Sequence, residues 1–238
     1  MSSRRPRPDQ QEYTLLEQTA TRKAIGERTL RSVLEKPVFW MQTQVDASAL
    51  VGARTQRRNR GDDPLPSYND FIIKAVALAL RNHPRFNAWV AADGLHLLKH
   101  INVGFAVATD QGVLMPTVLD ADVKALSAIA AETSEMIRLA RAGKLRASLQ
   151  MGAGFSISNI GPSEVDSFSA IISPPQTGIL AVGALKPRPL VVDGQIVARP
   201  TLICTLSVDH IAADGADGAR FLGEIKSILE DPAQLQAF

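Results

Sequence analysis

The sequence predicts an α+β fold in which a layer of helices packs on a mixed β-sheet, forming a two-layer sandwich. Amphipathic helical patterns alternate with short apolar strand patterns, but the order lacks the regular strand–helix–strand repetition of a parallel α/β protein. With 238 residues, of which 45% are hydrophobic and 21% charged, the chain is long and apolar enough to fill one large domain.

The first part of the chain changes from a polar arm to a helix and then to a strand. Residues 1–11 are basic and proline-rich, so we predict a disordered basic arm, followed by a single domain over residues 12–238. Residues 22–34 have a helix-forming composition, and Pro37 ends that helix. Residues 38–45 show a strand pattern.

A cluster of arginines follows the first strand pattern. Arg54, Arg57, Arg58 and Arg60 come shortly before a segment, residues 62–66, that contains two prolines. Guanidinium groups are well suited to bind phosphates. A charge run beside Pro and Gly is more often a solvated loop, and a solvated loop is what we predict here.

Two amphipathic helices are predicted in the middle of the chain. A wide apolar stripe runs from Asn69, the predicted N-cap, to Leu80, and the helix ends before Pro84. The second helix covers residues 126–140 and is closed by Gly143. Both apolar stripes require a sheet or another helix to cover them.

Strand patterns fill most of the remaining chain. Residues 101–109 and 113–118 read as a strand pair around Asp110-Gln-Gly112. Asp193-Gly194 is typical of a tight hairpin turn. The later predicted strands cover residues 155–160, 171–172, 179–182, 190–192, 195–197 and 202–208.

The last strand pattern runs directly into His210, and a helical pattern begins just after Gly215. The imidazole therefore lies at a strand end, where a sheet can fix the backbone while the side chain reaches a substrate, a position that suits a general base. Two ordinary structural roles also fit the spacing. Asp214 could be the N-cap of the last helix, with Asp217 completing a capping box, and His210 could be a hydrogen-bonded core residue.

The pattern His-x-x-x-Asp-Gly, here His210-Ile-Ala-Ala-Asp214-Gly215, resembles the catalytic signature of the 2-oxoacid dehydrogenase acyltransferases, the E2 components, and of their relative chloramphenicol acetyltransferase. The resemblance covers about residues 13 to 232, and it is strong because many short motifs agree in order. The other similar segments are Thr21-Arg-Lys-Ala-Ile, Ser67-Tyr-Asn-Asp-Phe, His83-Pro-Arg-Phe-Asn87-Ala, Ile101-Asn-Val-Gly-Phe, Gly112-Val-Leu-Met-Pro, Ala140-Arg-Ala-Gly-Lys-Leu, Phe155-Ser-Ile-Ser-Asn-Ile-Gly161 and Pro174-Pro175-Gln-Thr-Gly.

This resemblance implies a chloramphenicol acetyltransferase-like fold and transfer of an acyl group between coenzyme A and a thiol of the dihydrolipoamide type. A free thiol has a pKa near roughly 8.5, so a base that removes its proton speeds the attack, and His210 is the predicted base. The family motif places the hydroxyl that stabilises the oxyanion on Ser158. Ser156 and Ser158 point to the same face of their predicted strand.

The resemblance also implies residues that support the site. In the family the carboxylate at the position of Asp214 is structural and pairs with an arginine from the early part of the chain. Arg22 is the predicted partner, because a buried carboxylate needs a cation and a guanidinium can bind it with two hydrogen bonds. Gly215 and Asn159 complete the predicted support. Coenzyme A is expected as a substrate, a lipoyl group only on another chain, and no metal.

The predicted assembly is a homotrimer with active sites at the subunit interfaces, where the imidazole acts on thiols that enter a channel from opposite ends. A larger cage is left open. Full E2 chains carry a lipoyl domain and a small subunit-binding domain, and neither is recognisable here. The chain is therefore either an excised catalytic core or a freestanding acyltransferase whose acyl donor is coenzyme A or a lipoyl or carrier protein in trans.

Three departures from the family pattern affect the predicted specificity. Ile211 stands where the family usually has Arg, Gln176 where it commonly has Glu, and residues 152–155 lack an often-found Thr. Two alternatives therefore stay open. One is an E2-like acyltransferase that acts on a different acceptor, namely a hydroxyl, an amine or a carrier-protein thiol, and the other is a non-catalytic trimeric scaffold.

Motifs and composition argue against other functional classes for this protein. The chain has no Gly-x-Ser-x-Gly sequence, so it does not match a serine hydrolase with a nucleophile elbow. His96 and His100 are expected at the surface and not in a metal site. A net charge of +2 requires no nucleic acid, and no apolar run reaches the roughly 18 residues of a membrane helix. The single cysteine, Cys204, and the lack of a signal peptide predict a cytoplasmic location.

Overall fold

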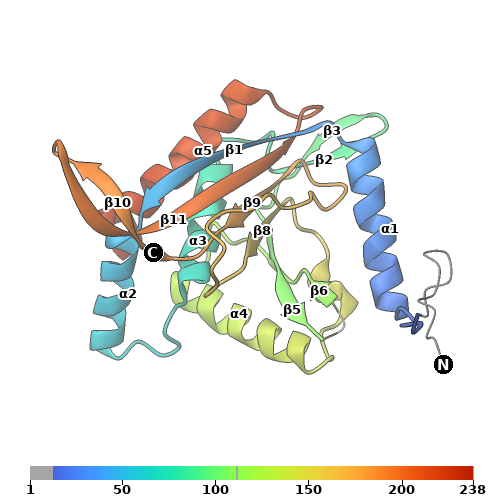
Figure 1. Ribbon diagram of the computed structural model, residues 1–238, viewed down its shortest axis with the longest axis horizontal. Helices are drawn as coiled ribbons and strands as arrows, with labels where there is room; N and C mark the ends of the chain where they lie inside the picture. The colour runs from blue at the N-terminus through green and yellow to red at the C-terminus, as the bar shows by residue number, and fades with distance from the viewer. Residues whose placement is uncertain (1–12, 111, 238) are drawn as a thin grey trace, which may run out of the picture.

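A seven-stranded mixed sheet forms the centre of the molecule (Figure 1). The computed structural model describes residues 13–110 and 112–237, so the predicted basic arm over residues 1–11 lies outside the described residues. The strands of this sheet are β1 (Val38–Asp46), β4 (Val103–Phe105), β7 (Thr117–Val118), β8 (Phe155–Asn159), β9 (Gly178–Val182), β10 (Lys186–Val192) and β11 (Gln195–Asp209). They follow the order β1-β11-β9-β8-β4-β7, and β10 pairs with β11. Only the β4–β8 and β8–β9 pairs are parallel.

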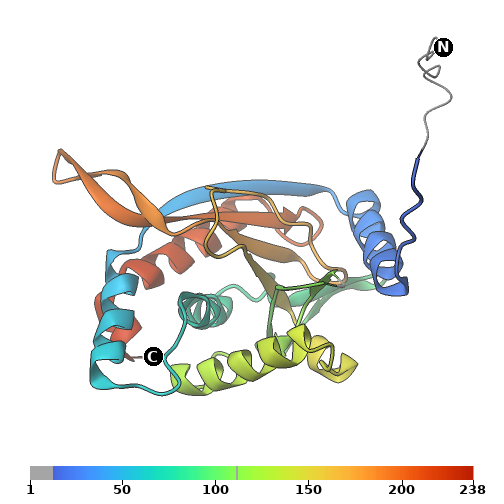
Figure 2. The ribbon, with the colours of Figure 1, turned by 60° about the horizontal axis from the view of Figure 1, so that its bottom comes forward.

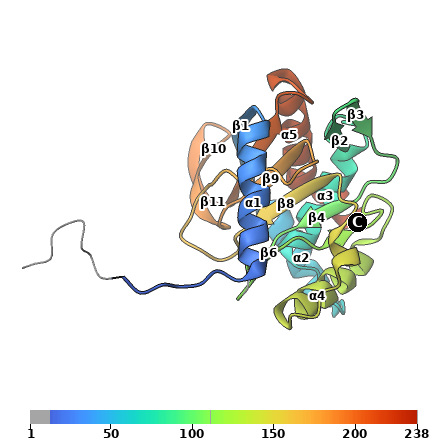
Figure 3. The same cartoon turned by 90° about the vertical axis from the view of Figure 1, so that its right-hand side faces the viewer.

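Helices cover the sheet unevenly. The helices are α1 (Ala20–Glu35), α2 (Ser48–Arg60), α3 (Tyr68–Leu80), α4 (Leu126–Arg141), α5 (Gly215–Glu230) and α6 (Pro232–Ala237). Figure 2 shows α3, α4 and α5 on one side of the sheet, with α3 between α4 and α5. Figure 1 shows α1 apart from these three helices, at the end of the molecule where β1 begins, and Figure 3, which looks onto that end, shows α1 in front of the sheet. The predicted layering of helices on a mixed sheet is confirmed.

Two small hairpins complete the described fold. β2 (Ala88–Ala91) pairs with β3 (Gly94–Leu97), and β5 (Val107–Thr109) pairs with β6 (Gly112–Leu114). The second hairpin confirms the strand pair predicted around residues 110–112. The longer β10–β11 hairpin projects from the body of the molecule, and it turns at Asp193 and Gly194, which both have positive φ.

The alternation of side chains along β8 separates the core from the candidate site. Phe155 and Ile157 are fully buried, and the Phe155 ring meets the Phe221 ring of α5 edge-on at 5.4 Å. Because successive side chains of a strand point to opposite faces, Ser156 and Ser158 face away from α5. Packing on one face of β8 thus fixes the direction of the hydroxyls on the other.

The predicted helices over residues 22–34, 69–80 and 126–140 are confirmed, and so is the closure by Gly143, whose φ is 67°. The N-cap of α3 is Ser67 and not Asn69. Ser67 and Asp70 form a capping box, which satisfies the first backbone N–H groups of the helix better than a cap two residues later would.

Two other predictions are wrong. The arginine cluster lies on α2 and not in a loop, because the helix buries Leu50 and Ala53 on one face and Arg57 pairs with Asp62 at 3.3 Å. Residues 171–172 form no strand. The Ile172 carbonyl instead accepts a hydrogen bond of 2.6 Å from the hydroxyl of Ser32 on α1.

Candidate active site

His210 is the first residue beyond β11, and its backbone is fixed while its side chain is exposed. Its N–H donates a hydrogen bond of 2.9 Å to the Pro37 carbonyl, next to Val38, which pairs with Asp209 in the sheet. The centroid of the imidazole lies 4.9 Å from that of the Phe39 ring. The predicted place of His210 at a strand end is confirmed, and the core-histidine alternative is wrong.

Asp214 begins the helix that follows this turn. Its side chain accepts a hydrogen bond of 2.9 Å from the Asp217 backbone, and Asp217 accepts one from the Asp214 backbone, so the alternative of a capping box is confirmed. The hydrogen bond from the Asp217 backbone holds the pKa of the Asp214 carboxyl below its ordinary value. The Ala216 N–H and the nearby charges of Arg220 and His210 lower it further, while partial desolvation opposes them.

The predicted ion pair between Arg22 and Asp214 is not formed within the described part of one chain. Arg22 lies on the exposed first turn of α1, where its backbone N–H donates to the Thr19 hydroxyl at 3.2 Å. Asp214 is already bonded at the start of α5. A Cβ at Gly215 would meet no atom within 4 Å, so space alone does not require glycine there. An Arg22–Asp214 contact between two chains stays a prediction.

Ser158 lies near the end of β8 and lines a hollow of about 410 Å³. The rest of this hollow is mostly apolar and comes from α1, from β6 and its surroundings, and from residues 168–174. Asn159 bridges elements beside it, since its amide nitrogen donates to Asn69 at 3.3 Å and its oxygen accepts from the Gly161 N–H at 2.8 Å. These bonds support the end of β8, and the predicted support of the site by Asn159 stays a prediction.

Ser158 and His210 are far apart within one chain. Ser158 pairs with Ala181 of β9, and Ala181 pairs with Thr205 of β11, so Ser158 and Thr205 lie level across the sheet. Strand geometry of ~3.3 Å per residue and ~4.8 Å per strand then places His210 about 20 Å from Ser158. One chain therefore cannot bring both side chains to the same reacting atoms.

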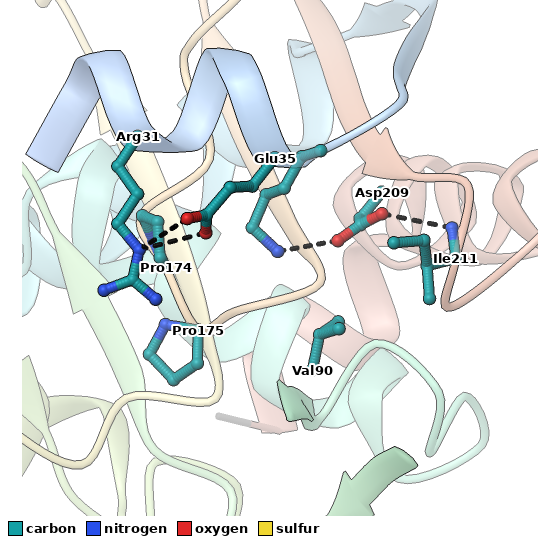
Figure 4. Close-up of a pocket in the computed structure, with 8 residues that line it drawn as sticks. Arg31, Glu35, Val90, Pro174, Pro175, Asp209 and Ile211 are labelled. Carbon is teal, nitrogen blue, oxygen red and sulfur yellow. Dashed lines mark hydrogen bonds and ion pairs between the residues drawn. The ribbon is translucent and has the colours of Figure 1, made fainter. Parts of the chain in front are cut away.

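A hollow of about 360 Å³ is lined by Asp209 and Ile211, the two chain neighbours of His210 (Figure 4). Val90, Pro174, Pro175 and Ile211 form its apolar part, and Ile211 is 61% exposed in the position where the family usually has Arg. The charged part consists of two ion pairs. Figure 4 shows Arg31 bonded to Glu35, and Lys36 is bonded to Asp209.

The pair of Lys36 and Asp209 is not among the residues that the sequence predicts for the site. Lys36 Nζ lies 2.6 Å from Asp209 Oδ2, and the two side chains are 7% and 0% exposed. The only local signal was a carboxylate that ends an otherwise apolar strand directly before the candidate base. Its partner lies 173 positions away, a separation at which periodicity carries no information about contacts.

The other two departures from the family pattern, Gln176 and residues 152–155, contact each other. Gln176 is 6% exposed and donates to the Ala153 carbonyl at 3.3 Å, which also accepts from the Trp89 indole at 2.9 Å. The segment over residues 152–155 and Gln176 thus hold each other. Neither reaches His210 by a hydrogen bond that the structure describes.

No group of three potential metal ligands occurs within residues 13–110 and 112–237. His96 bonds to Asp93 and His100 bonds to Asp120, both at the surface as expected. Over the same ranges, no helix has the length and apolar character that a membrane crossing requires.

The fold defines the class of protein first. Chloramphenicol acetyltransferase superposes with a TM-score of 0.55 over 85% of this chain and 94% of its own, at 16% sequence identity, which confirms the predicted fold class. The chain belongs to the 2-oxoacid dehydrogenases acyltransferase (catalytic domain) family, whose model matches residues 10–237.

Two curated relatives illustrate the range within this family. The acetyltransferase component of the pyruvate dehydrogenase complex from Rickettsia bellii is 36% identical over 226 residues, which are 94% of this chain and 54% of that protein. The succinyltransferase component of the 2-oxoglutarate dehydrogenase complex from Bartonella vinsonii subsp. berkhoffii is 38% identical over 195 residues, which are 81% of this chain and 47% of that protein. The chain thus spans about half the length of these relatives.

Solved structures of E2 cores align over nearly the whole chain. Dihydrolipoamide acetyltransferase from Azotobacter vinelandii, in which the catalytic roles of a serine, a histidine and an asparagine were investigated, has a TM-score of 0.89 at 28% identity and covers 99% of both chains. The cubic core of a pyruvate dehydrogenase multienzyme complex has a TM-score of 0.88 at 28% identity and the same coverage.

Proposed function

We propose that this chain transfers an acyl group between coenzyme A and a thiol of the dihydrolipoamide type, with His210 as the general base. The observation that carries the proposal is an exposed imidazole on a fixed backbone at the end of β11, in a member of an acyltransferase family. His210 takes the proton of the incoming thiol, and the resulting thiolate attacks the thioester carbonyl.

The attack produces a tetrahedral intermediate whose negative oxygen accepts a hydrogen bond from the Ser158 hydroxyl. Collapse of the intermediate breaks the carbon–sulfur bond of the original thioester. The departing thiolate then takes the proton from the imidazolium of His210, so base and charge are restored. Because Ser158 and His210 of one chain are about 20 Å apart, the serine comes from a neighbouring chain.

The Azotobacter vinelandii relative supports these roles. A serine, a histidine and an asparagine were investigated in its catalytic mechanism, and that asparagine follows the histidine by four positions. Asp214 follows His210 by four positions here and caps α5, a role that Asn also fulfils well. We propose that Asp214, Gly215 and Asn159 support the site and do not touch the reacting atoms.

We propose a homotrimer with active sites between subunits. Apolar side chains gather on the surface near Ser32 and Ser207, where a hollow of about 270 Å³ includes Val33, Val38, Trp40 and Ile171. The Trp40 side chain is 61% exposed, and a contiguous exposed apolar patch of this kind is typical of an interface. Particle mass distinguishes this trimer from a larger cage such as the related cubic core.

The proposal also names the substrates, the catalytic domain and the location of the protein. Coenzyme A is a substrate, and the second thiol arrives on a lipoyl or carrier protein in trans. Residues 12–238 act as one catalytic domain. The cytoplasmic location expected from the sequence stays a prediction.

The test is release of coenzyme A from its acetyl thioester in the presence of dihydrolipoamide. We expect His210→Ala to lower turnover by about 10²–10⁴-fold, the usual contribution of a general base. His96→Ala is the matched control, because His96 is exposed on β3 and its ring bonds to Asp93. Acetyl, succinyl and branched-chain thioesters are compared. Release only with another acceptor would favour the alternative acceptor, and no release with any donor would favour the scaffold.

A further inference from the structure

Lys36 and Asp209 form a buried ion pair directly beside the candidate base. The Nζ–Oδ2 distance is 2.6 Å, and both side chains are almost completely inaccessible. Lys36 follows the last residue of α1, and its backbone N–H donates to the Ser32 carbonyl at 3.1 Å. Loss of either partner would leave the other charge buried without compensation, so the two residues constrain each other strongly.

The pair belongs to a set of contacts that hold the turn over residues 209–213. Asp209 Oδ1 accepts from the Ile211 N–H at 3.1 Å, and the Asp209 carbonyl accepts from the Ala212 N–H at 2.9 Å. Next to Lys36, the Pro37 carbonyl accepts from the His210 N–H. The dipeptide 36–37 therefore binds the dipeptide 209–210 twice, once through side chains and once through the backbone.

No other cation takes the place of Lys36 in the described part of the chain. Arg85 bonds to the Ala212 carbonyl at 3.1 Å, Arg31 is paired with Glu35, and Arg220 is paired with Asp217. Asp209 thus has one charged partner, and that partner is anchored at the end of α1.

We propose that Lys36 is a positioning residue of the active site: by holding Asp209, it fixes the backbone from which His210 presents its imidazole. The inference rests on the proposed function, because turnover is its first readout. Lys36 acts through Asp209 and not on the reacting thiol, so its loss should change the chemical step more than substrate binding.

The first test compares Lys36→Met with Lys36→Arg. We expect Lys36→Met to lower kcat about 10–100-fold with KM changed less than about threefold, because a small displacement of a catalytic group costs up to ~10²-fold in rate. Lys36→Arg should recover most of the loss, since its guanidinium can still bind the carboxylate. Arg138→Met is the control, because it breaks an exposed ion pair with Glu135 on α4. Wild-type kcat in Lys36→Met would overturn the inference.

A second variant separates the loss of positioning from misfolding of Lys36→Met. The double variant Lys36→Met with Asp209→Asn has no unpaired buried charge and should match the wild type in circular dichroism and nearly in Tm. If Lys36 positions the turn, kcat should still be at least about tenfold low, because the tie between α1 and Asp209 is gone. Wild-type kcat in this double variant would show that Lys36 only neutralises Asp209, and the inference would fail.

Nuclear magnetic resonance gives a readout that does not depend on turnover. The chain has four histidines, so ¹³C labelling at the imidazole ring gives few signals, and His210→Gln assigns the signal of interest. The His210 signal should shift and broaden in Lys36→Met and in the double variant, but not in Arg138→Met. If the His210 signal shifts in Lys36→Met but the wild type has no acyltransferase activity, the proposed function is wrong and this inference still holds. An unchanged signal would overturn it.

Discussion

Ser158 and His210 lie in the same sheet about 20 Å apart, because the pairing of β8, β9 and β11 places Ser158 level with Thr205. Each chain therefore carries the proposed oxyanion donor at a hollow near the end of β8 and the proposed base at the end of β11. A symmetric oligomer can join the base of one chain with the donor of the next, since every subunit repeats both halves.

This arrangement predicts complementation between two inactive variants. His210→Ala and Ser158→Ala should each be nearly inactive, with losses of about 10²–10⁴-fold and 10²–10³-fold. When both are co-expressed in equal amounts, about one interface in four joins an intact histidine to an intact serine, so activity should return to about a quarter of the wild-type value. The measurement is coenzyme A release by the purified mixed oligomer. Mixed oligomers as inactive as their parents would mean that the two side chains do not share a site.

Asp214 allows its capping role to be separated from an ionic role. Asp214→Asn should keep Tm and kcat close to the wild type, because Asn caps helices as well as Asp does, whereas Asp214→Ala should lower Tm by a few degrees and reduce kcat. Thermal unfolding and turnover of both variants check this. A large loss of activity in Asp214→Asn would instead favour an ion pair with Arg22 of another chain, and Arg22→Gln should then show the same loss.

The lowered pKa of Asp214 also fixes the sign of its pH dependence. The folded protein binds the proton of this carboxyl less readily than the unfolded chain does, chiefly because of the hydrogen bond from the Asp217 backbone. Its stabilising contribution is therefore present above the unfolded pKa of about 3.9 and is lost as the pH falls through the lower folded value. Tm measured from pH 6 downward should fall less steeply in Asp214→Asn than in the wild type.

The buried thiol of Cys204 should make the folded protein less stable at high pH. Burial raises the pKa of its thiol to about 12, above the ordinary value of 9.0, with a small opposite effect from Lys226. The unfolded chain therefore gains by ionising from about pH 9 upward, and stability should fall by on the order of 1 kcal/mol per pH unit until about pH 12. Cys204→Ala should remove this part of the slope of Tm against pH. Rapid reaction of the folded protein with a thiol reagent at pH 8 would contradict the burial.

Local signals account for what the sequence predicted correctly. The helices α3 and α4 and the hairpin at Asp193-Gly194 follow from apolar spacing and turn residues that lie close together in the chain. The junction between β11 and α5 was predictable for the same reason. An apolar run stops at His210, and a helix start signal follows at Asp214.

The errors and omissions arise where distant residues decide the structure. The arginines before residue 61 were assigned to a loop, yet packing of Arg57 over the Phe71 ring and its pairing with Asp62 make that face of α2 a buried one. Lys36 and Asp209 meet only because β1 pairs with β11 along its whole length. Which distant strands pair depends on how the whole sheet assembles, so the residues near Lys36 or Asp209 in the sequence carry no signal of this pairing.

Ile211 is the departure from the family pattern that bears most directly on substrate choice. Ile211 is 61% exposed and lines the hollow of about 360 Å³, while its backbone N–H donates to Asp209. Ile211→Arg keeps that backbone bond, so kcat with an acetyl thioester should stay within about threefold of the wild type.

The charged side chains of the hollow already pair with each other, Arg31 with Glu35 and Lys36 with Asp209. The guanidinium added by Ile211→Arg therefore remains free to bind a carboxylate. The ratio of kcat/KM for succinyl over acetyl thioester should therefore rise about three- to tenfold, as expected for one partly exposed charge-assisted hydrogen bond. An unchanged ratio would show that the acyl group does not pass Ile211, and Ile211→Ala, which adds no charge, serves as the control.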